Sequence, residues 1–522
     1  MTQENVQTVI IAGAGPAGLT AACFLLRHKG YRVIILEESF QTGGISRTEK
    51  YKGNRMDIGG HRFFTKVDSV NDFWQSLMPM QGKPAYDDLR LDRIPAMAPD
   101  GPDPEQVDRV MLSRNRVSRI YYLKRFFDYP VTLSLSTVFA MGLGRTFLAG
   151  TSFLWSMIHK RREDSLEDFY INRFGRRLYS MFFERYTEKL WGVHPGRISP
   201  SWGAQRVKGL SLGKAVINVL TKPFRGKNAA VETSLIETFQ YPKFGPGQLW
   251  ETAAERVIAS GGEIRYGQKV VRVEMDKTQR IRRVYACSPD GVETAYDCDA
   301  FFSSMPVKDL MESFSPAVPD DVLSIARGLP YRDFITVGVL VKKLAIANKT
   351  DRKTLGNIVP DCWIYIQEPD VRLGRLQIFN NWSPYMVEDP EHTVWLGLEY
   401  FCTEGDDLWE QDEASFKAFA ISELDKIGII EGKDVLDSVE IRVKKAYPAY
   451  FGTYERFDEL RAWLDQVPNL YCIGRNGQHR YNNMDHSMLT AMEAVDVFRS
   501  GDRDRSRIWD VNTEKSYHET RS

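Results

Sequence analysis

The stretch Val9-Ile-Ile-Ala-Gly13-Ala-Gly15-Pro-Ala-Gly18 decides the fold, because an apolar strand runs there into three spaced glycines. A second apolar run, Arg32-Val-Ile-Ile-Leu-Glu37, ends in an acid nineteen positions after Gly18. The order strand, glycine turn, helix, strand and acid is typical of a dinucleotide-binding βαβ unit. The first glycine of such a unit permits the tight turn, the second admits the pyrophosphate, and the third lets helix and strand pack closely.

The rest of this unit supplies the groups that a dinucleotide needs. The start of the helix offers N–H groups and a positive dipole end to phosphates, and Glu37 can accept a hydrogen bond from a ribose hydroxyl. The alternative is a tight βα turn without a ligand. Strand, helix, second strand and acid all occur in the right order, so the sequence predicts a dinucleotide site.

Composition limits the class of protein. The 522 residues suggest two or three domains. Lys and Arg together number 69, as do Asp and Glu, so no overall field favours nucleic acid or an anionic membrane. The six cysteines form neither a CxxC pair nor a metal-ligand spacing, which predicts a reducing compartment and no metal site. The N-terminus runs straight into the first strand, so we expect no signal peptide and a cytoplasmic enzyme.

The segment 131–158 is rich in apolar residues but carries Arg145 at its centre. A spanning helix needs about 20 mostly apolar residues without a central charge. We therefore expect buried or amphipathic helices of a substrate domain. The alternative is peripheral docking on a membrane, helped by the flanking Lys160-Arg161-Arg162.

The predicted fold class is α/β, with a Rossmann-type domain interleaved with a mixed α+β substrate domain. We expect a helix to begin after Ser165 as N-cap and to break at Gly175, and a second clear helix near 413–427. The dinucleotide domain is expected in the segments 1–75, 236–312 and 463–500. The substrate domain is expected in 76–235, largely helical, and in 313–462, which contains a sheet, with a polar tail at 501–522.

Two glycine-dense loops follow the first unit, Gly43-Gly44-Ile-Ser-Arg47 and Asp57-Ile-Gly-Gly60-His61-Arg-Phe-Phe-Thr65. With these loops, the stretch from Gly13 to Thr65 resembles the flavoprotein superfamily that contains amine oxidases, protoporphyrinogen oxidase and UDP-galactopyranose mutase. The resemblance implies that the dinucleotide is FAD. It also implies that Val270 holds the adenine by backbone contacts, and that Gly474 begins the segment along the ribityl chain and flavin.

Four segments resemble the mutase branch, in the order of that family. They are the His61 loop, Tyr186-Thr-Glu-Lys-Leu-Trp191, Ala446-Tyr447-Pro, and Gly474-Arg475-Asn-Gly-Gln-His479-Arg-Tyr481-Asn-Asn483-Met484. The chain departs from the family where His479 replaces a tyrosine and Asn483 an aspartate. Arg206 is the expected diphosphate arginine with a one-residue offset, and 310–440 has no counterpart. These departures leave the substrate open.

The resemblance implies that reduced flavin attacks the anomeric carbon of a sugar while the diphosphate departs, without net redox change. A departing diphosphate needs Arg and Tyr donors, and a base or sugar face needs a flat apolar wall. The catalytic candidates are His61, Tyr186, Trp191, Arg206, Tyr447, Arg475 and Tyr481. The expected cofactor residues are Gly13, Gly15, Pro16, Ala17, Gly18, Glu37, Glu38, Gly44, Ser46, Arg47, Gly60, His61, Val270, Gly474, Arg475 and Met484.

Other interpretations stay open at this point. Core packing is an alternative role for Trp191, Tyr186 and Tyr447. His61 also suits a structural hydrogen bond, and Arg475 also suits a surface position. We expect Asp485 to cap the closing helix, and Lys189 and Lys208 to be solvated. The main functional alternative is an FAD oxidoreductase that takes a hydride from an amine or an apolar substrate. A third is a flavoprotein without catalysis. The expected partner is a small-molecule substrate, a diphosphate-bearing sugar, and not a nucleic acid.

Overall fold

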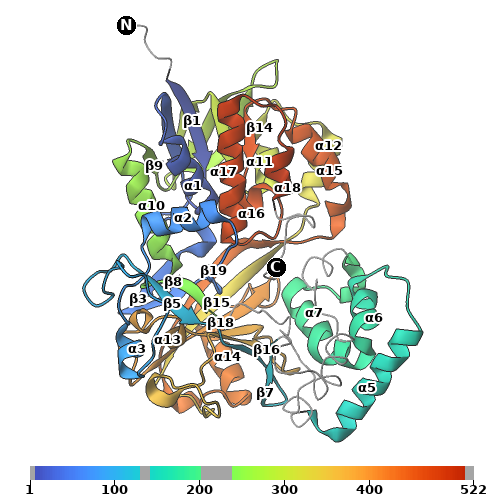
Figure 1. Ribbon diagram of the computed structural model, residues 1–522. Coiled ribbons are helices and arrows are strands. Elements are labelled where there is room, and N and C mark those ends of the chain that lie inside the picture. The colour runs from blue at the N-terminus through green and yellow to red at the C-terminus, as the bar shows by residue number, and fades with distance from the viewer. Residues whose placement is uncertain (1–5, 130–140, 201–237, 512–522) are drawn as a thin grey trace, which may run out of the picture. The chain divides into compact units, whose positions relative to one another are not determined.

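The computed structural model describes residues 6–129, 141–200 and 238–511 (Figure 1). The chain divides into two compact units. Among the described residues, unit 1 comprises 6–113, Gln240–Tyr331 and 445–511. Unit 2 comprises 114–129, 141–200, 238–239 and Arg332–Lys444. The chain therefore passes between the units several times, and each unit is described by itself.

Unit 1 is built on a five-stranded parallel sheet. The strand order is β20-β13-β1-β2-β9, so the N-terminal strand lies in the middle. Its strands are short and apolar, as expected for a sheet that is covered on both faces. They are β1 (Gln7–Ala12), β2 (Tyr31–Leu36), β9 (Glu263–Arg265), β13 (Ala300–Ser303) and β20 (Leu470–Cys472).

Side chains on the two faces of this sheet enter two different cores, because successive residues of a strand point in opposite directions. Val9 and Ile11 pack in one core with the helices α1, α10 and α17. Ile10 and Ala12 pack in the other core, which is shared with the second sheet of unit 1. The helices of the first face are α1 (Pro16–Leu25), α10 (Pro246–Ala259) and α17 (Met484–Ser500), which lie together in Figure 1.

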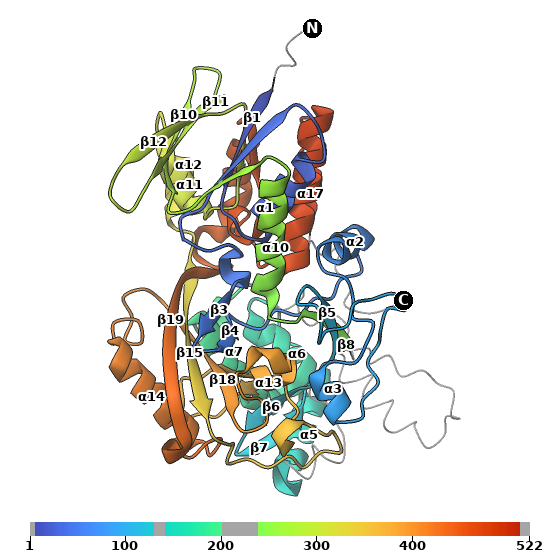
Figure 2. The same cartoon turned by 90° about the vertical axis from the view of Figure 1, so that its left-hand side faces the viewer.

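The second sheet of unit 1 has the order β12-β11-β10-β14. Figure 2 shows its long hairpins beside α11 and α12. Its elements are β10 (Lys269–Met275), β11 (Ile281–Cys287), β12 (Glu293–Asp297), α11 (Val307–Ser313), β14 (Phe314–Ser315), α12 (Asp320–Arg327) and α15 (Phe457–Leu464). The remaining elements with bounds inside unit 1 are β3 (Thr48–Tyr51), β4 (Asn54–Asp57), α2 (Asp68–Leu77), α3 (Tyr86–Arg90), α16 (Gly474–Gly477) and α18 (Ser506–Asp510).

Unit 2 is built on a seven-stranded sheet of order β19-β15-β18-β17-β16-β6-β7. The strand β18 lies between β15 and β17 and is buried along its whole length, and its core is shared with α14 (Glu413–Lys426), a helix that the sequence predicted. The strands are β6 (Ser118–Tyr122), β7 (Arg125–Asp128), β15 (Tyr331–Val341), β16 (Trp363–Ile366), β17 (Arg375–Ile378), β18 (Val394–Cys402) and β19 (Val435–Pro448). Two short strands, β5 (Met111–Asn115) and β8 (Thr238–Pro242), pair separately.

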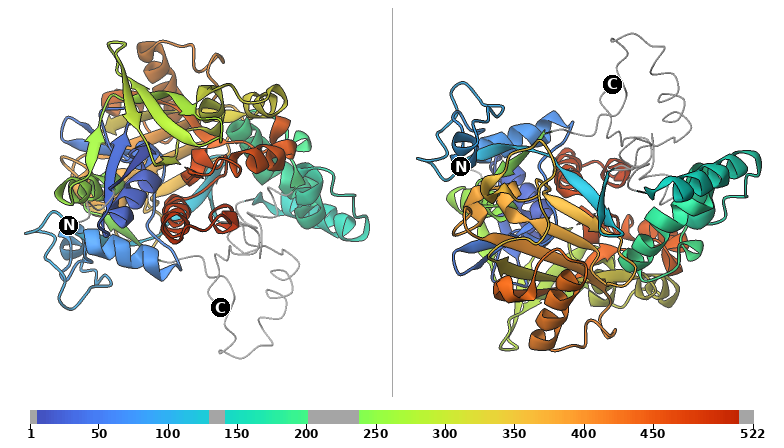
Figure 3. Two further views of the ribbon diagram at one scale, coloured as in Figure 1. Left: turned by 90° about the horizontal axis from the view of Figure 1, so that it is seen from above. Right: turned by 90° about the horizontal axis from the view of Figure 1, so that it is seen from below.

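Unit 2 also carries a helical part made of α5 (Leu143–Ile158), α6 (Leu166–Tyr179), the π-helical turn η2 (Ser180–Glu184) and α7 (Arg185–Trp191). α5 and α6 lie side by side in both views of Figure 3. The predicted cap is confirmed, because the Asp168 N–H donates to the Ser165 side chain. The predicted break is confirmed too, since Gly175 has a φ of 78°. No helix in the described ranges has the length and apolar character needed to cross a bilayer.

Candidate cofactor and substrate site

Two of the three glycines after β1, Gly13 and Gly18, leave no room for a side chain. Gly13 has a φ of +96°, a conformation that L-residues rarely adopt. A Cβ on Gly18 would overlap the Gly13 carbonyl oxygen and lie 3.2 Å from the Ile11 side chain. The third glycine is therefore required for close packing of α1 on β1, as the sequence predicts.

Two further segments close on this turn at the carboxyl ends of the parallel strands. Gly474, with a φ of +75°, follows β20, and a Cβ there would lie 2.9 Å from the Ala17 Cβ. Ser304 follows β13, and its hydroxyl donates to the Ala12 carbonyl at 2.7 Å. A Cβ on Gly13 or on Gly474 would lie within 4 Å of the Ser304 side chain. We call the backbone turn formed by Gly13, Gly18 and Gly474 the cradle. Ser304 belongs to it, although the sequence did not single this residue out.

The loop after β2 completes the cradle. A Cβ on Gly15 would lie 3.8 Å from the Gly44 Cα, and the Gly43 N–H donates to the Ala14 carbonyl at 2.9 Å. Arg47 turns back to donate to the Gly44 carbonyl at 3.0 Å. The residues that follow Gly44 form the short 3-10 helix η1 (Gly44–Ser46), in which Ser46 is buried. A cationic side chain thus stands beside the glycine loop that faces the α1 N-terminus.

Glu37 ends β2 and is buried. Its carboxylate accepts hydrogen bonds from the Ala14 N–H at 2.6 Å and from the Ser39 N–H and hydroxyl at 2.9 and 2.7 Å. The carboxylate therefore holds the glycine turn in place. The neighbouring Glu38 is exposed and forms an ion pair with Lys269 at 3.1 Å.

The remaining predicted cofactor residues occupy different positions in unit 1. Pro16 is the first residue of α1, and Gly15 caps that helix with no side-chain hydrogen bond. Val270 is buried in β10 next to an irregularity in its pairing with β11. Met484 begins α17, whose N-cap is Asn483 with a capping-box hydrogen bond to His486. The expectation that Asp485 is the cap is therefore wrong, because the N-cap lies two residues earlier, at Asn483.

Four of the catalytic candidates come together in unit 1, beside Gly474. The rings of Tyr447 and Tyr481 stack with their centroids 5.5 Å apart. The Arg475 guanidinium lies 4.9 Å from the Tyr481 ring and 5.6 Å from the Tyr447 ring. Its Nε donates to the Asn482 carbonyl at 2.8 Å and its Nη1 to the Ala446 carbonyl at 3.1 Å. These contacts fix a cation and two phenols one residue after the cradle.

His61 is the fourth member of this group. Its Nδ1 lies 2.9 Å from the Gly59 carbonyl oxygen, which can only accept, so Nδ1 carries the proton of the neutral ring. A Cβ on Gly59 would lie 3.8 Å from the His61 Cε1 and 3.9 Å from the Tyr447 hydroxyl. Gly59 and Gly60 therefore let the imidazole approach the tyrosine pair, and Gly60 itself is exposed.

Two other candidates lie in unit 2 on α7, and Arg206 lies outside the described residues. Tyr186 is half-buried and packs edge to face on Tyr365 at 5.6 Å between centroids. Tyr365 also lies 4.6 Å from the Tyr129 ring. Sequence reasoning missed Tyr129 and Tyr365, because these two residues are far apart in the chain. Trp191 is only 2% exposed, so its side chain packs in the interior of unit 2.

The end of α7 is held by two buried cations. The Lys189 ammonium donates to the carbonyls of Ile366, Glu368 and Leu373 at 3.2, 3.0 and 3.1 Å. Burial lowers the pKa of Lys189 to about 8. The Arg332 Nε donates to the Leu190 carbonyl at 3.2 Å, where the helix dipole is negative. The expectation that Lys189 is solvated is therefore wrong, because its ammonium is largely buried and donates to three backbone carbonyls.

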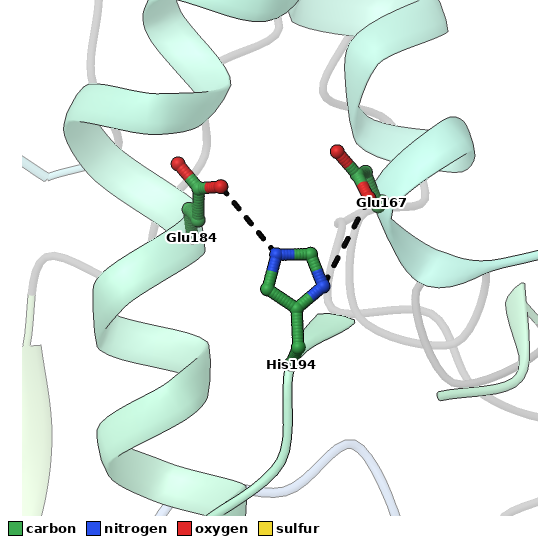
Figure 4. A group of neighbouring side chains, drawn as sticks. All are labelled: Glu167, Glu184 and His194. Carbon is green, nitrogen blue, oxygen red and sulfur yellow. Dashed lines mark ion pairs between the residues drawn. The ribbon is translucent and has the colours of Figure 1, made fainter. Parts of the chain in front are cut away.

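A histidine and two glutamates gather at the start of η3 (Pro195–Arg197) in unit 2 (Figure 4). Glu167, Glu184 and His194 each offer one atom within 4.8 Å of the others. The Gly196 N–H donates to the His194 Nδ1 at 3.0 Å, so the neutral ring carries its proton on Nε2, 3.5 Å from the Glu184 carboxylate. This bonding is that of a polar network in which His194, the N-cap of η3, bridges α6 and η2, and we assign no metal to it.

Two buried titratable groups of unit 1 were not expected. Burial raises the pKa of Asp57 to about 7, and its carboxyl accepts from the Thr48 hydroxyl at 2.8 Å and from the Tyr241 hydroxyl. Burial lowers the pKa of His479 to about 4, and its Nε2 contacts the Ala449 carbonyl at 3.0 Å. His479 is fully buried, so its side chain makes a structural contact and is not exposed to a ligand from solvent.

Comparisons with known proteins agree with this architecture. Residues 11–77 match the family described as NAD(P)-binding Rossmann-like domain. A stretch of 70 residues is 39% identical to L-amino-acid oxidase of Crotalus adamanteus. This stretch covers 13% of this chain and 13% of that protein. The crystal structure of reduced UDP-galactopyranose mutase superposes with a TM-score of 0.74 at 20% identity, over 97% of this chain and 99% of that one. A structure from Exiguobacterium sp. 255-15, assigned as a protoporphyrinogen oxidase, gives 0.65 at 14% identity over 94% and 99%.

The match to the Rossmann-like family confirms the predicted dinucleotide-binding domain. The superpositions cover nearly all of the chain, so they extend the likeness from the glycine turn to both units. The sequence match to the oxidase is confined to a short stretch. The chain therefore shares the fold of UDP-galactopyranose mutase, as the resemblance of its sequence implies.

Proposed function

We propose that unit 1 binds FAD and that the chain is an FAD-dependent enzyme. The cradle supports this proposal, because a Cβ on Gly13 or Gly474 would fill the space beside Ala17 and Ser304. The first turn of α1 leaves N–H groups without intrahelical partners, which suits a pyrophosphate. Gly13, Gly15, Pro16, Ala17, Gly18, Glu37, Glu38, Gly44, Ser46, Arg47 and Val270 would hold the ADP half. Gly60, His61, Gly474, Arg475 and Met484 would hold the remainder, as the resemblance implies.

The substrate that we propose is a sugar linked to a nucleotide or a lipid through a diphosphate. The single observation that carries this proposal is the position of Arg475, one residue after the cradle glycine and in contact with two phenol rings. A guanidinium and hydroxyl donors match the charge and the acceptors of a diphosphate. An enzyme that only removes a hydride from an apolar substrate has no need for this combination.

In the proposed reaction the bound flavin, in its reduced form, supplies a nucleophile for the anomeric carbon. Arg475 would compensate the charge that develops on the departing diphosphate, and Tyr447 and Tyr481 would donate hydrogen bonds to its oxygens. His61 would orient a sugar hydroxyl or the flavin edge through its unprotonated Nε2. The conversion of a pyranose into a furanose would then proceed without net oxidation.

Unit 2 carries the aromatic residues that the resemblance assigns to the substrate. Tyr186 and Tyr365 already pack edge to face, and they offer ring surface for a nucleotide base or a sugar face. Trp191, at the end of the same helix, would keep α7 in place from its buried position. Arg206 is the second arginine that we propose for the diphosphate, on the resemblance alone.

The redox dependence of turnover tests this proposal. The purified protein is incubated without oxygen with nucleotide-linked pyranoses, once with oxidised flavin and once after reduction by dithionite, and the sugar products are separated. We expect isomerised sugar only with the reduced flavin, which stays reduced throughout. Absence of conversion in both states, over a panel of nucleotide sugars, would refute the mutase-like activity.

The second candidate is an FAD-dependent oxidoreductase. The short match to L-amino-acid oxidase and the fold shared with the Exiguobacterium protein favour it. The same samples separate the two candidates. An oxidoreductase would bleach its oxidised flavin when mixed with an amine or apolar substrate, and it would form no isomerised sugar.

A further inference from the structure

Helix α5 in unit 2 has its large apolar side chains on the outside. Leu143, Phe147, Leu154 and Ile158 lie on one stripe of the helix, and they are 79%, 71%, 59% and 77% exposed. A surface helix normally turns such residues toward the core. Trp155 is also exposed, at 65%. The exposed surface of α5 is therefore of the kind that marks an interaction site.

The opposite side of α5 is held firmly by small residues, so the helix is not simply unpacked. Ala149 and Ser156 are the buried residues of α5. Gly175 allows the backbone of α6 to approach, because a Cβ there would lie 2.8 Å from the Phe153 Cα. The Arg177 N–H donates to the Ser152 hydroxyl at 3.2 Å. The orientation of α5 that exposes its apolar stripe is thus fixed by contacts with α6.

The charges around this stripe are positive. α5 contains no acidic residue, and its own charge is Arg145. Arg176 and Arg177 of α6 line an open groove beside α5 with Leu148 and Trp155, and this groove measures about 530 Å³. Among the described ion pairs, none involves Arg145, Arg176 or Arg177. No described carboxylate therefore competes with an anionic partner for these three arginines.

The run Lys160-Arg161-Arg162, which the sequence offered as a membrane contact, is less available. Arg161 forms an ion pair with Asp168 at 3.3 Å, and Arg162 one with Asp164 at 2.7 Å. The positive surface is consequently made by the arginines of α5 and α6 rather than by the run that follows α5.

We propose that α5 lies in the plane of an anionic phospholipid surface, with its apolar stripe among the acyl chains and Arg176 and Arg177 on headgroup phosphates. Charge complementarity selects this occupant, because the groove beside the stripe is lined by Arg176, Arg177 and the exposed Trp155, the residue types of helices that bind membrane interfaces. The helix has 16 residues and spans about 24 Å, which suits lying on a bilayer rather than crossing it. The inference does not depend on the FAD proposal.

Vesicle co-sedimentation of the full chain tests the inference. The vesicles contain phosphatidylglycerol with phosphatidylcholine, or phosphatidylcholine alone, at low and at physiological salt. We expect binding to the anionic vesicles that weakens with salt. The triple variant Phe147→Ser/Leu154→Ser/Ile158→Ser should bind at least about tenfold more weakly. The variant Arg176→Gln/Arg177→Gln should lose most of the preference for phosphatidylglycerol.

The control replaces exposed apolar residues elsewhere, in the variant Ile94→Ser/Leu436→Ser, at positions that are 89% and 47% exposed. It should bind like the parent. All variants should keep the parent's melting temperature and flavin content, because the replaced side chains are exposed. A parent that ignores anionic vesicles, a triple variant that binds like the parent, or equal binding to phosphatidylcholine alone would overturn the proposal. So would sedimentation velocity that shows a dimer which the triple variant dissolves, because α5 would then contact a second copy.

Discussion

The rings of Tyr447 and Tyr481 lie nearly parallel, with 18° between their planes, although Tyr447 lies in β19 and Tyr481 precedes α17. The Arg475 guanidinium approaches both rings, and two backbone carbonyls hold it there. A cation that is fixed in this way is preorganised for an anion, and it need not be ordered when a substrate binds. The cluster is therefore the part of unit 1 from which the proposed chemistry can be tested most closely.

Arg475→Lys should retain the positive charge but lose the planar contact with the tyrosines and the paired hydrogen bonds. We expect kcat/KM for the sugar substrate to fall by about a hundredfold, with flavin content unchanged. Steady-state kinetics of the reduced enzyme measure this effect. Arg499→Lys, at the exposed end of α17, is the control and should leave kcat/KM unchanged.

Tyr481→Phe removes one hydroxyl and keeps the stacked ring. We expect a loss of about tenfold in kcat/KM, because a hydrogen bond to a charged group contributes about 1.5–3 kcal/mol. Tyr266→Phe, which removes a half-exposed hydroxyl elsewhere in unit 1, is the matched control. Equal activities of the two variants would argue against a phenol donor at position 481.

Gly474→Ala tests the cradle against a matched glycine. Gly474 and Gly428 have nearly the same φ, +75° and +76°, but only Gly474 is crowded, and the space beside Gly428 is open. Both alanine variants should lose about 1–2 kcal/mol of stability to backbone strain. Only Gly474→Ala should also lose flavin, which is measured by the ratio of flavin to protein absorbance. Similar flavin content in the two variants would place the cofactor away from Gly474.

The two buried titratable groups of unit 1 should give opposite pH dependences of stability. His479 has its pKa lowered to about 4 by burial, so its contribution to folding is present above its ordinary value of 6.5 and is lost as pH falls toward 4. Asp57 has its pKa raised to about 7, so its contribution is present below its ordinary value of 3.8 and is lost as pH rises toward 7. The effect amounts to about 3 kcal/mol for His479 and about 4 kcal/mol for Asp57, so the two largely offset each other.

Single variants should uncover each slope. Relative to the parent, Asp57→Asn should become more stable as pH rises from about 4 to about 7, whereas His479→Gln should become less stable over the same interval. Urea denaturation at several pH values measures both slopes. Variants with the parent's pH profile would show that neither group titrates as its burial implies.

Removal of Arg119 should destabilise unit 2 more than removal of a surface arginine. Arg119 pairs with the completely buried Asp361 at 2.6 Å, and Arg372 pairs with the exposed Asp407 at 3.1 Å. Arg119→Met leaves a buried carboxylate without its cation, and we expect a loss of about 3 kcal/mol. Arg372→Met should change stability by less than about 1 kcal/mol. Equal losses in urea denaturation would contradict this difference.

The parts of the fold set by local rules could be predicted from the sequence. The Gly13 turn, the Ser165 cap and the break at Gly175 each depend on backbone conformation within a few residues, and the structure has all three. The resemblance also selected Tyr447, Arg475 and Tyr481, which the structure brings together. Their roles remain predictions.

Other features depend on partners that are distant in the chain. Ser304 enters the cradle only because β13 pairs with β1. The burial of Lys189 depends on a loop near residue 370 that offers three carbonyls. The exposed stripe of α5 reverses the usual rule, since small residues face α6 and large ones face outward. Periodicity identifies such a helix but does not tell which side is covered.

The most direct measurement is the identity and stoichiometry of the bound cofactor. Protein purified in the dark is denatured, and the released chromophore is identified by chromatography and mass spectrometry, while stripped protein is titrated with FAD and with NAD. The account predicts one FAD per chain. Titration of the stripped protein should restore this content, and the Gly474→Ala variant should hold less FAD than the parent. A colourless protein that takes up NAD but no FAD would contradict it.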